Sequence, residues 1–533
     1  MFKILVADQI ADEGLAALRA RSDISFEIKT GLSPDALGKI VGEFDGLIIR
    51  SGVKVTREAL ANPGKLRVIA RAGVGVDNVD VPAATAAGVL VMNTPDANTV
   101  STAEHAIAMI LAAMRGIAGA HSHVIEGKWE RKQFMGRQVA GKTLGIVGFG
   151  RVGCAVARRA LGLDMTVIAF DPLLSAESAL DGRVRLVRRL EDLLPLVDIL
   201  TLHASVSAES KKMIGKPQLE RMKPGAVLVN CARGALLDEA AVAEALNAGR
   251  LGGAAIDVFS TEPPAGNPLL TAKNVVLTPH LGASTEEAQT AVSTEAVESI
   301  LNYLTNGVIR GAVNVTGMPS NLSARDRAYM DLTARMGTIL SPFCAGGVER
   351  IELVTQGGDA LRALCPTLAL TALTELMSPH IEGRLNLVNA ADFAKERGIA
   401  VGHTGQSGRR DYYEVVTLKI ARGTETHISE GAVFQDGLPR ILSIDGYGME
   451  IVPEGLLVQI LNNDQPGVIG LVGTFFGDHK INIADMALSR RGRLALMVLK
   501  IDGELPDAVL DALRAKGPPI LSVRAVQLAA VGS

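Results

Sequence analysis

The sequence predicts an α/β protein with two doubly wound parallel-sheet lobes, followed by an α+β domain and a small ferredoxin-like βαββαβ domain. Up to about residue 315, short β-branched runs alternate with helical patterns. After residue 318 the composition changes, with glycine pairs at 346–347 and 357–358. At roughly 100 to 200 residues per domain, the 533 residues predict three or four domains.

The composition excludes several classes of protein. Hydrophobic residues make up 48% and charged residues 21% of the chain, which excludes a mainly disordered or collagen-like protein. The net charge of -3 does not indicate a nucleic-acid or anionic-membrane partner. The apolar stretch Ala106–Met114 is far shorter than the ~18 to 20 residues that span a bilayer. The first residues indicate a strand rather than a signal peptide, so we expect a cytoplasmic protein with no membrane partner.

The four cysteines are scattered along the chain and form no CxxC pair. They are Cys154, Cys231, Cys344 and Cys365. Such spacing argues against a zinc site and against a secreted disulfide framework. We therefore expect buried thiols and no metal.

The first 315 residues contain a regular series of expected strands. They span residues 3–7, 46–50, 67–71, 143–147, 166–170, 199–202, 226–230 and 275–277. Helical patterns between them predict helices on both faces of parallel sheets. The helical stretch Ala103–Met114 lies between two sets of strand–helix units and is therefore expected to link two lobes.

A glycine motif after the strand at 143–147 predicts a dinucleotide site. Gly148, Gly150 and Gly153 form Gly-x-Gly-x-x-Gly, and the helical run Cys154–Leu161 follows. This arrangement allows a tight turn and lets a pyrophosphate rest on the helix N-terminus. The next strand ends at Asp171, about 20 residues beyond the glycines, where an acid binds the ribose hydroxyls and repels a 2′-phosphate. The pattern favours NAD over NADP.

Three polar residues follow later strands, where open α/β sheets gather their active sites. They are Arg233, Glu262 and His280. A histidine can accept the hydroxyl proton when an alcohol is oxidised. A carboxylate can orient that histidine, and an arginine offers two parallel donors to a substrate carboxylate. Taken singly, each residue also suits a structural role: a surface ion pair, a loop acid before prolines or a hydrogen-bonded loop histidine.

Together and in this order, these motifs resemble the D-isomer-specific 2-hydroxyacid dehydrogenase family over roughly residues 1 to 315. Arg50–Val55, Arg71–Asp80, Trp129–Lys132 and His280–Thr285 resemble the branch of that family that acts on 3-phospho-D-glycerate. The resemblance implies a substrate-binding domain of residues 1–98 and 284–317 around an NAD-binding Rossmann domain of residues 99–283. The active site is then expected in the cleft between them, with the Ala103–Met114 helix in a hinge and dimer region.

The resemblance also implies particular site residues. For the cofactor they are Val74, Gly148, Gly150, Arg151, Val152, Gly153, Asp171, His203, Cys231, Ala232, Arg233, Asp257, His280 and Gly282, with Asp257 facing the nicotinamide carboxamide. For the substrate they are Arg50, Ser51, Gly73, Val74, Gly75, Arg131, Arg233 and His280. The basic residues Arg50, Lys54, Arg131 and Lys132 are candidate partners of a substrate phosphate, or simply solvated side chains. Because Arg131 is expected to reach a neighbouring subunit's site, we expect a homo-oligomer, a dimer or tetramer.

The last segment, residues 454–533, shows the order strand, helix, strand, strand, helix, strand. The expected elements span residues 456–461, 466–477, 481–488, 494–501, 506–516 and 520–526, which is the ferredoxin-like arrangement. Asp464 is expected to cap the first helix. The loop around it resembles the ACT domain, which implies that Asp464 and Asn482 bind an amino-acid effector such as L-serine. A structural loop without a ligand is the alternative.

The middle segment, residues 318–453, resembles the intervening, allosteric substrate-binding domain of the long form of this dehydrogenase branch. Five basic residues in it suit either an anion site or a solvated face. They are Arg384, Arg409, Arg410, Lys419 and Arg422.

The resemblance implies an enzyme that oxidises 3-phospho-D-glycerate to 3-phosphooxypyruvate with NAD, the first step of the phosphorylated route to L-serine. One alternative is another D-2-hydroxyacid dehydrogenase, acting as a 2-oxoglutarate, glycerate or hydroxypyruvate reductase. The other is an NAD-sensing regulatory protein similar to the corepressors that keep this fold.

Overall fold

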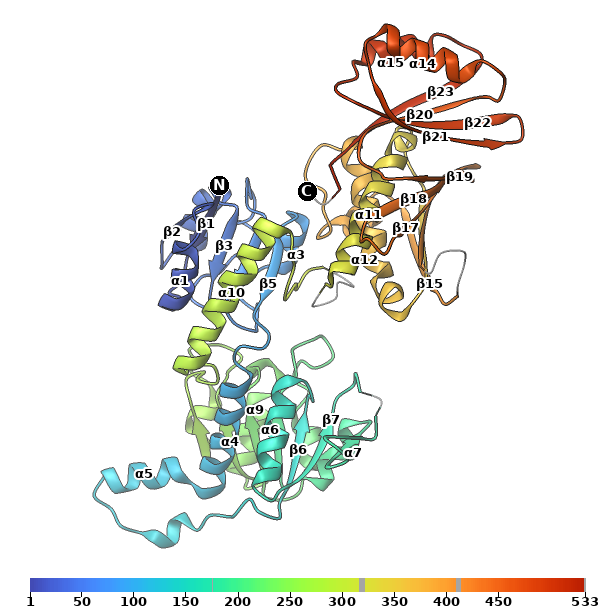
Figure 1. Cartoon of the computed structure of the whole chain (residues 1–533). Coiled ribbons are helices and arrows are strands. Elements are labelled where there is room, and N and C mark those ends of the chain that lie inside the picture. Colours follow the sequence, from blue (N-terminus) through green and yellow to red (C-terminus); the bar gives the residue numbers. More distant parts are fainter. Residues whose placement is uncertain (175, 316–321, 409–413, 532–533) are drawn as a thin grey trace.

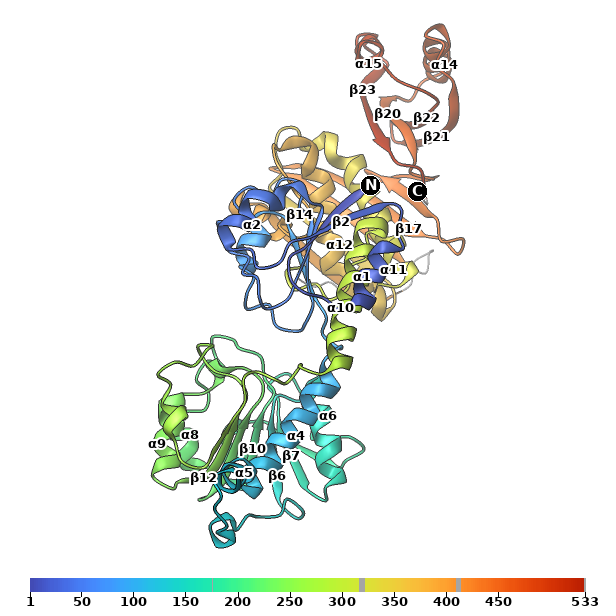
Figure 2. The same cartoon turned by 90° about the vertical axis from the view of Figure 1, so that its left-hand side faces the viewer.

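The computed structural model describes residues 1–174, 176–315, 322–408 and 414–531, and these form four sheets. The chain builds a first lobe, an elongated second lobe below it and a C-terminal half on the other side of the first lobe (Figure 1). The view turned by 90° shows the same order, with α4 and α10 running between the first two lobes (Figure 2).

The first lobe is a five-stranded parallel sheet of order β2-β1-β3-β4-β5. Its strands are β1 (Phe2–Val6), β2 (Ile24–Ile28), β3 (Gly46–Ile49), β4 (Val68–Arg71) and β5 (Leu90–Asn93). One face packs on α1 (Asp12–Arg19) and α10 (Glu286–Asn306), and the other packs on α2 (Pro34–Ile40) and α3 (Val81–Ala86). The lobe is therefore doubly wound, as predicted, and a helix from much later in the chain completes it.

The second lobe is an eight-stranded sheet of order β13-β12-β11-β10-β6-β7-β9-β8, parallel except for the β8–β9 pair. Its strands are β6 (Thr143–Val147), β7 (Thr166–Phe170), β8 (Ser178–Ala179), β9 (Val184–Val187), β10 (Ile199–Leu202), β11 (Ala226–Asn230), β12 (Leu251–Ile256) and β13 (Val275–Leu277). The helices α4 (Thr99–Arg115) and α6 (Arg151–Gly162) cover one face, and α7 (Leu190–Leu193), α8 (Lys216–Arg221) and α9 (Glu239–Asn247) cover the other. The strand order reverses between β6 and β10, which is where such sheets bind ligands.

An arm projects from this lobe at its far end (Figure 1). It comprises α5 (Ile117–Ile125), the 3-10 turn η2 (Arg131–Phe134) and the loops around them. Large apolar side chains on the arm are open to solvent: Ile125 is 73%, Trp129 76% and Met135 86% exposed. The arm thus presents an apolar surface that this chain does not cover.

The middle domain is a six-stranded sheet of order β15-β14-β16-β17-β18-β19 with α11 (Ala324–Leu340), α12 (Asp359–Met377) and α13 (Ala390–Glu396). The strands are β14 (Arg350–Gln356), β15 (Ala400–Gln406), β16 (Val415–Arg422), β17 (Glu425–Val433), β18 (Pro439–Ile444) and β19 (Tyr447–Ile451). Among the described residues, the helix Asp359–His380 is long and apolar enough to cross a membrane, but 67% of its most apolar window is buried inside the protein. Its apolar residues belong to the core of this domain.

The C-terminal domain has the predicted ferredoxin-like order. It consists of β20 (Gly455–Asn463), α14 (Val468–Asp478), β21 (Ile483–Arg491), β22 (Leu494–Ile501), α15 (Asp507–Arg514) and β23 (Ile520–Leu528), in an antiparallel sheet of order β21-β22-β20-β23. One sheet face packs on α14 and α15, and the other contributes to the core of the middle domain. The expected cap at Asp464 is wrong: α14 begins after Gly467, and no side chain caps it.

The middle domain contacts the first lobe through residues 384–388. The Arg384 guanidinium donates to the carbonyls of Gly64 and Leu66, and the Asn386 amide donates to the Gly88 carbonyl. Val388 is buried in the core of the first lobe. Arg384 is therefore an interdomain contact rather than an anion site or a solvated side chain.

Two further basic candidates of the middle domain have neighbours within that domain. Lys419 lies 3.4 Å from Glu352, and Arg422 lies against Gly346. Arg409 and Arg410 lie outside the described residues.

Candidate active site

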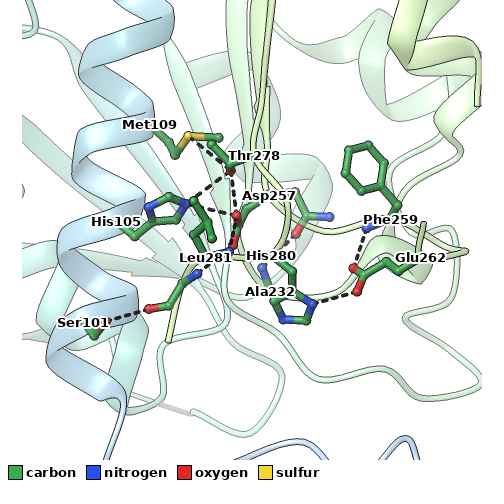
Figure 3. Close-up of polar contacts among 12 residues, drawn as sticks. Ser101, His105, Met109, Ala232, Asp257, Phe259, Glu262, Thr278, His280 and Leu281 are labelled. Carbon is green, nitrogen blue, oxygen red and sulfur yellow. Dashed lines mark hydrogen bonds and ion pairs between the residues drawn. The ribbon is translucent and has the colours of Figure 1, made fainter. Parts of the chain in front are cut away.

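The predicted histidine and glutamate meet at the edge where β12 and β13 end. His280 Nδ1 lies 2.8 Å from Glu262 Oε2, and the other Glu262 oxygen accepts a hydrogen bond from the Phe259 amide at 3.1 Å (Figure 3). The two side chains are 49% and 39% exposed. Because an ionised carboxylate only accepts, His280 donates through Nδ1 and leaves Nε2 for a substrate.

Arg233 follows β11 in the second lobe and contacts the first lobe. Its Nε lies 3.1 Å from Asp77 Oδ2, and a Cβ on Gly75 would stand 1.9 Å from its Nη2. Among the described residues, no hydrogen bond joins Arg233 to His280 or Glu262. The structure thus places Arg233 on the first-lobe side of the cleft, against the Gly73–Gly75 loop.

Arg71, at the end of β4, forms a group of arginines with Arg50 of the first lobe and Arg233 of the second. Burial, the neighbouring charge of Arg233 and the charge of Arg50 lower the pKa of Arg71 to about 10. Its Nε is buried without a hydrogen-bond partner, and its Nη1 lies against Gly73. Arg50 follows β3 and donates to Gln9 O at 3.1 Å and to the side chain of Gln289. The site therefore holds positive charge that calls for an anionic ligand.

The glycine motif forms an open cradle between β6 and α6. Gly148 has φ +90°, and a Cβ there would stand 2.6 Å from the His203 carbonyl carbon. A Cβ on Gly153 would stand 2.1 Å from Gly148 O, so helix and turn pack too closely for any other residue. A Cβ on Gly150 would meet nothing within 4 Å. The residues therefore fit a dinucleotide, whose pyrophosphate can approach the backbone at Gly150.

Asp171 ends β7 beside this cradle, where the cofactor ribose is expected. Its two oxygens accept hydrogen bonds from the amides of Phe149 at 2.8 Å and Leu173 at 2.9 Å. An ionised carboxylate has about four acceptor positions, so it can still accept ribose hydroxyls. Arg151, the first residue of α6, forms an ion pair with Asp96 in the segment that links the two lobes.

His203 follows β10 and borders the cradle. Burial lowers the pKa of His203 to about 4, so its ring is neutral near pH 7. Its Nε2 lies 3.0 Å from the Thr201 hydroxyl.

Asp257, at the end of β12, is fully buried and holds the His280 loop. Its carboxylate accepts from the Thr278 hydroxyl at 2.6 Å and from the amides of Leu281 and Gly282 at 2.7 and 3.0 Å (Figure 3). His105 Nε2 lies 3.1 Å from the same carboxylate. Asp257 was expected to face the nicotinamide carboxamide, and both of its carboxylate oxygens already have partners within the protein.

Cys231 lies close to this network but has the character of a neutral thiol. Its sulfur and the ligand atoms of His105 and Asp257 lie within 4.8 Å of one another. Burial and the Asp257 charge raise the pKa of Cys231 well above its ordinary value. Metal ligation needs a thiolate, so this environment favours the hydrogen-bonded network over a metal site.

The other expected site residues lie around the cleft or away from it. The Val74 carbonyl accepts from the Asn93 side chain at 2.6 Å, and the Gly73 amide donates to the Thr94 hydroxyl at 2.7 Å. Val152 lies in the first turn of α6, and Ala232 follows β11 with its amide donating to Asn230. Ser51 is exposed. Arg131 is exposed on the projecting arm.

Three residues that the sequence did not assign to the site contact or lie close to residues that it did: Arg71, Asp77 and His105. Arg71 is the last residue of β4, a strand that was predicted. We looked for polar residues at strand ends only in the second lobe, and the same search in the first lobe would have found Arg71. Asp77 and His105 act through contacts between distant elements, for which the sequence offers no pattern.

The two expected effector residues are paired within the C-terminal domain. Asp464 Oδ1 lies 3.4 Å from Arg490 Nε, and the Asn482 amide donates to Asp502 at 2.7 Å. An effector ammonium group would compete with Arg490 for the Asp464 carboxylate.

A Rossmann-type lobe, a histidine–carboxylate pair and arginines across a cleft define an NAD-dependent dehydrogenase of 2-hydroxy acids. The family "D-isomer specific 2-hydroxyacid dehydrogenase, NAD binding domain" matches residues 107–282. The "D-3-phosphoglycerate dehydrogenase intervening domain" matches residues 326–445, and the "ACT domain" matches residues 457–517.

Full-length relatives identify the family. The chain is 40% identical to a D-3-phosphoglycerate dehydrogenase of Synechocystis sp., covering 96% of this chain and 92% of the relative. It is 38% identical to that of Methanocaldococcus jannaschii, covering 99% and 100%. The chain therefore belongs to the D-3-phosphoglycerate dehydrogenase family.

Solved structures match somewhat more than half of the chain. The TT0316 protein of Thermus thermophilus is 35% identical with a TM-score of 0.52, over 57% of this chain and 96% of that one. An NAD complex of the NAD-dependent formate dehydrogenase of Staphylococcus aureus is 29% identical with a TM-score of 0.51, over 58% and 96%.

Proposed function

We propose that this protein oxidises 3-phospho-D-glycerate to 3-phosphooxypyruvate with NAD, the first step of the phosphorylated route to L-serine. The observations that support it most strongly are the His280–Glu262 pair and the arginines Arg50 and Arg233, which lie close enough to Arg71 for their charges to act on it. A phosphorylated hydroxy acid carries two anionic groups, and guanidinium groups are suited to both. The family membership of the chain supports the same substrate.

The proposed chemistry assigns one task to each residue. His280 Nε2 accepts the proton of the C2 hydroxyl, while Glu262 stabilises the resulting imidazolium through Nδ1. Arg233 binds the carboxylate and polarises the neighbouring C2 oxygen. The Gly148–Gly153 cradle would hold NAD, which would supply the acceptor for the hydride that leaves C2. The alcohol is thus oxidised by two electrons, and its proton stays on His280 until solvent removes it.

The proposed cofactor is NAD rather than NADP, because the Asp171 carboxylate would repel a 2′-phosphate. We assign its binding to Val74, Gly148, Gly150, Arg151, Val152, Gly153, Asp171, His203, Cys231, Ala232, Arg233, Asp257, His280 and Gly282. Substrate binding is assigned to Arg50, Ser51, Gly73, Val74, Gly75, Arg131, Arg233 and His280, to which we add Arg71. Asp257 contributes by holding the loop that borders the nicotinamide pocket.

We also propose that the protein works as a homo-oligomer. The projecting arm exposes Ile125, Trp129 and Met135, and Arg131 lies on the same arm away from its own cleft. A second copy would cover this apolar surface and receive Arg131 at its substrate site.

The C-terminal domain is proposed to bind an amino-acid effector, with L-serine as the first candidate. Asp464 offers a carboxylate to its ammonium group, and the paired Arg490 would be displaced. Asp464→Asn should then abolish serine inhibition and leave turnover without serine unchanged. Equal inhibition of both proteins would remove Asp464 from the site.

The division of the chain and its location complete the proposal. We assign residues 1–98 with 284–317 to substrate binding, 99–283 to NAD, 318–453 to the intervening domain and 454–533 to the ACT domain. A cytoplasmic location without membrane or nucleic-acid partners suits the near-neutral charge and the buried α12.

The test is NADH oxidation by the purified full-length protein with 3-phosphooxypyruvate, 2-oxoglutarate or hydroxypyruvate, each with and without L-serine. We expect the highest kcat/KM for the phosphorylated acid. Preference for an unphosphorylated acid would keep the dehydrogenase chemistry and change the substrate. No turnover with any acid, together with NAD binding, would favour the regulatory alternative.

A further inference from the structure

The loop that carries His280 is held from α4, the helix that follows the link between the two lobes. Two side chains on the first turns of α4 hold this region (Figure 3). Ser101 Oγ donates to Gly282 O in the loop at 2.9 Å, and His105 Nε2 lies 3.1 Å from Oδ1 of Asp257, which in turn binds the loop. Both contacts join elements that are more than 150 residues apart in the sequence. The chain thus runs from the first lobe into α4, and side chains of α4 hold the catalytic loop by hydrogen bonds.

Asp257 is the centre of this connection. Its backbone carbonyl accepts from the His280 amide at 2.9 Å, and its carboxylate accepts from the amides of Leu281 and Gly282. A fully buried carboxylate is costly unless it is well paired, so its position is fixed by its donors. The position of Asp257 therefore sets the position of three consecutive residues of the catalytic loop, His280, Leu281 and Gly282.

The loop needs this support because His280 adopts a strained backbone. Its φ is +56°, in the left-handed region that is unfavourable for a residue other than glycine. Such conformations persist only where the surroundings over-determine them. The hydrogen bonds at residues 280–282 provide that constraint, and they aim the imidazole at Glu262.

Among the described donors to the Asp257 carboxylate, His105 is the one that lies on α4 rather than in residues 278–282. The Thr278 hydroxyl and the loop amides belong to the segment that Asp257 holds, so they move with it. His105 is anchored differently, because α4 packs through Ala103, Ala106 and Met109 into the core of the second lobe. It therefore fixes Asp257 relative to the rest of the lobe.

We propose that His105 is a positioning residue for the dehydrogenase reaction: through Asp257 it holds the strained loop that aims His280 at the substrate. The proposal rests on the proposed function for its kinetic consequence only. Because its Nε2 is engaged by Asp257, we expect His105 to touch neither substrate nor nicotinamide. Its loss should therefore slow the chemical step and leave ground-state binding nearly unchanged.

Two variants test this, with a control on the same helix. His105→Gln keeps an N–H donor at a similar reach, His105→Leu removes it, and Glu104→Gln alters the neighbouring surface residue that pairs with Arg159. We measure kcat, KM for 3-phospho-D-glycerate and the Kd for NADH by fluorescence. His105→Leu should lower kcat on the order of tenfold or more, with KM and Kd changed less than about twofold. His105→Gln should recover most of kcat, and Glu104→Gln should match the wild type.

Hydrogen exchange of the Leu281 and Gly282 amides gives a second readout that needs no substrate. His105→Leu should accelerate their exchange at least tenfold, while amides in β6 keep their rates. Equal kcat and equal exchange in His105→Leu and wild type would overturn the proposal. So would parallel losses of kcat, NADH affinity and Tm in both His105 variants, because that result assigns His105 a general structural role. If the wild type lacks turnover but His105→Leu still loosens the loop, the proposed function fails and the positioning role stands.

Discussion

Replacing Arg71 with methionine should change stability and catalysis in opposite directions. Arg71 is a largely buried cation near two others, and burial and the Arg233 charge hold its pKa at about 10. A fall of this size from the ordinary value corresponds to roughly 3 kcal/mol by which the free protein disfavours the charged side chain. Methionine has a similar reach and no charge. We therefore expect Arg71→Met to raise the free energy of unfolding by about 1 to 3 kcal/mol.

The same substitution removes a charged donor that we propose binds the substrate phosphate. A hydrogen bond to a charged group contributes about 1.5 to 3 kcal/mol, so kcat/KM for 3-phospho-D-glycerate should fall about tenfold to a hundredfold. Activity with D-glycerate, which lacks the phosphate, should change much less. The stability is measured by urea denaturation without ligands, and the selectivity by initial rates of NADH formation.

A matched control lies at the other end of the same strand. Arg67 precedes β4, and its guanidinium lies over the rings of Phe2 and Tyr303, 5.7 Å from each centroid. Arg67→Met should lower stability slightly and leave the ratio of the two substrates unchanged. Lower stability of Arg71→Met together with an unchanged kcat/KM for the phosphorylated acid would refute the reasoning.

Three further predictions concern other parts of the chain. Glu262→Gln should lower kcat about tenfold, because a half-exposed charged hydrogen bond to the imidazolium is lost; unchanged kcat in steady-state assays would contradict this. Burial opposes a charged His427, but Asp445 and Glu425 outweigh burial and raise its pKa above 6.5. Protonated His427 therefore stabilises the fold in full below about pH 6.5, and this contribution should vanish as pH rises through the raised pKa. Urea titrations at several pH values should show this decline in the free energy of unfolding for the wild type and not for His427→Gln. Arg384→Ala should speed amide exchange at the start of β4 and β5 without altering exchange in the second lobe; equal exchange would exclude the interdomain contact in solution.

The sequence predicted most of the sheets because their strands are buried and β-branched. Every strand expected in the first 315 residues is present, and the ends of β6, β7, β10 and β11 agree to the residue. The strands β2, β5, β8, β9 and β12 were not in the expected series. β2 is an edge strand that carries Ser25 and Glu27, and β8 has only two residues, so neither gives a clear alternating or continuous apolar pattern. β5 does carry a continuous apolar run, Val89–Met92, and was overlooked.

The part of the site that lies at one sheet edge was predictable from the sequence. His280 and Glu262 meet because both follow strands that end at that edge. The ion pair of Arg233 with Asp77 was not predictable, because it joins two lobes whose relative position no local pattern encodes. The same holds for His105, whose partner Asp257 is reached only once α4 packs on the sheet. The burial that perturbs Arg71 is likewise a property of the assembled lobe.

The central claim is that hydride leaves C2 of 3-phospho-D-glycerate for NAD in the cleft that His280 borders. The most direct test incubates the purified protein with NAD and 3-phospho-D-glycerate deuterated at C2, and follows the label by mass spectrometry. We predict deuterium in the reduced cofactor, loss of that transfer in His280→Ala, and little transfer from C2-deuterated D-glycerate. Transfer that is equal from the unphosphorylated acid, or that persists in His280→Ala, would contradict the account.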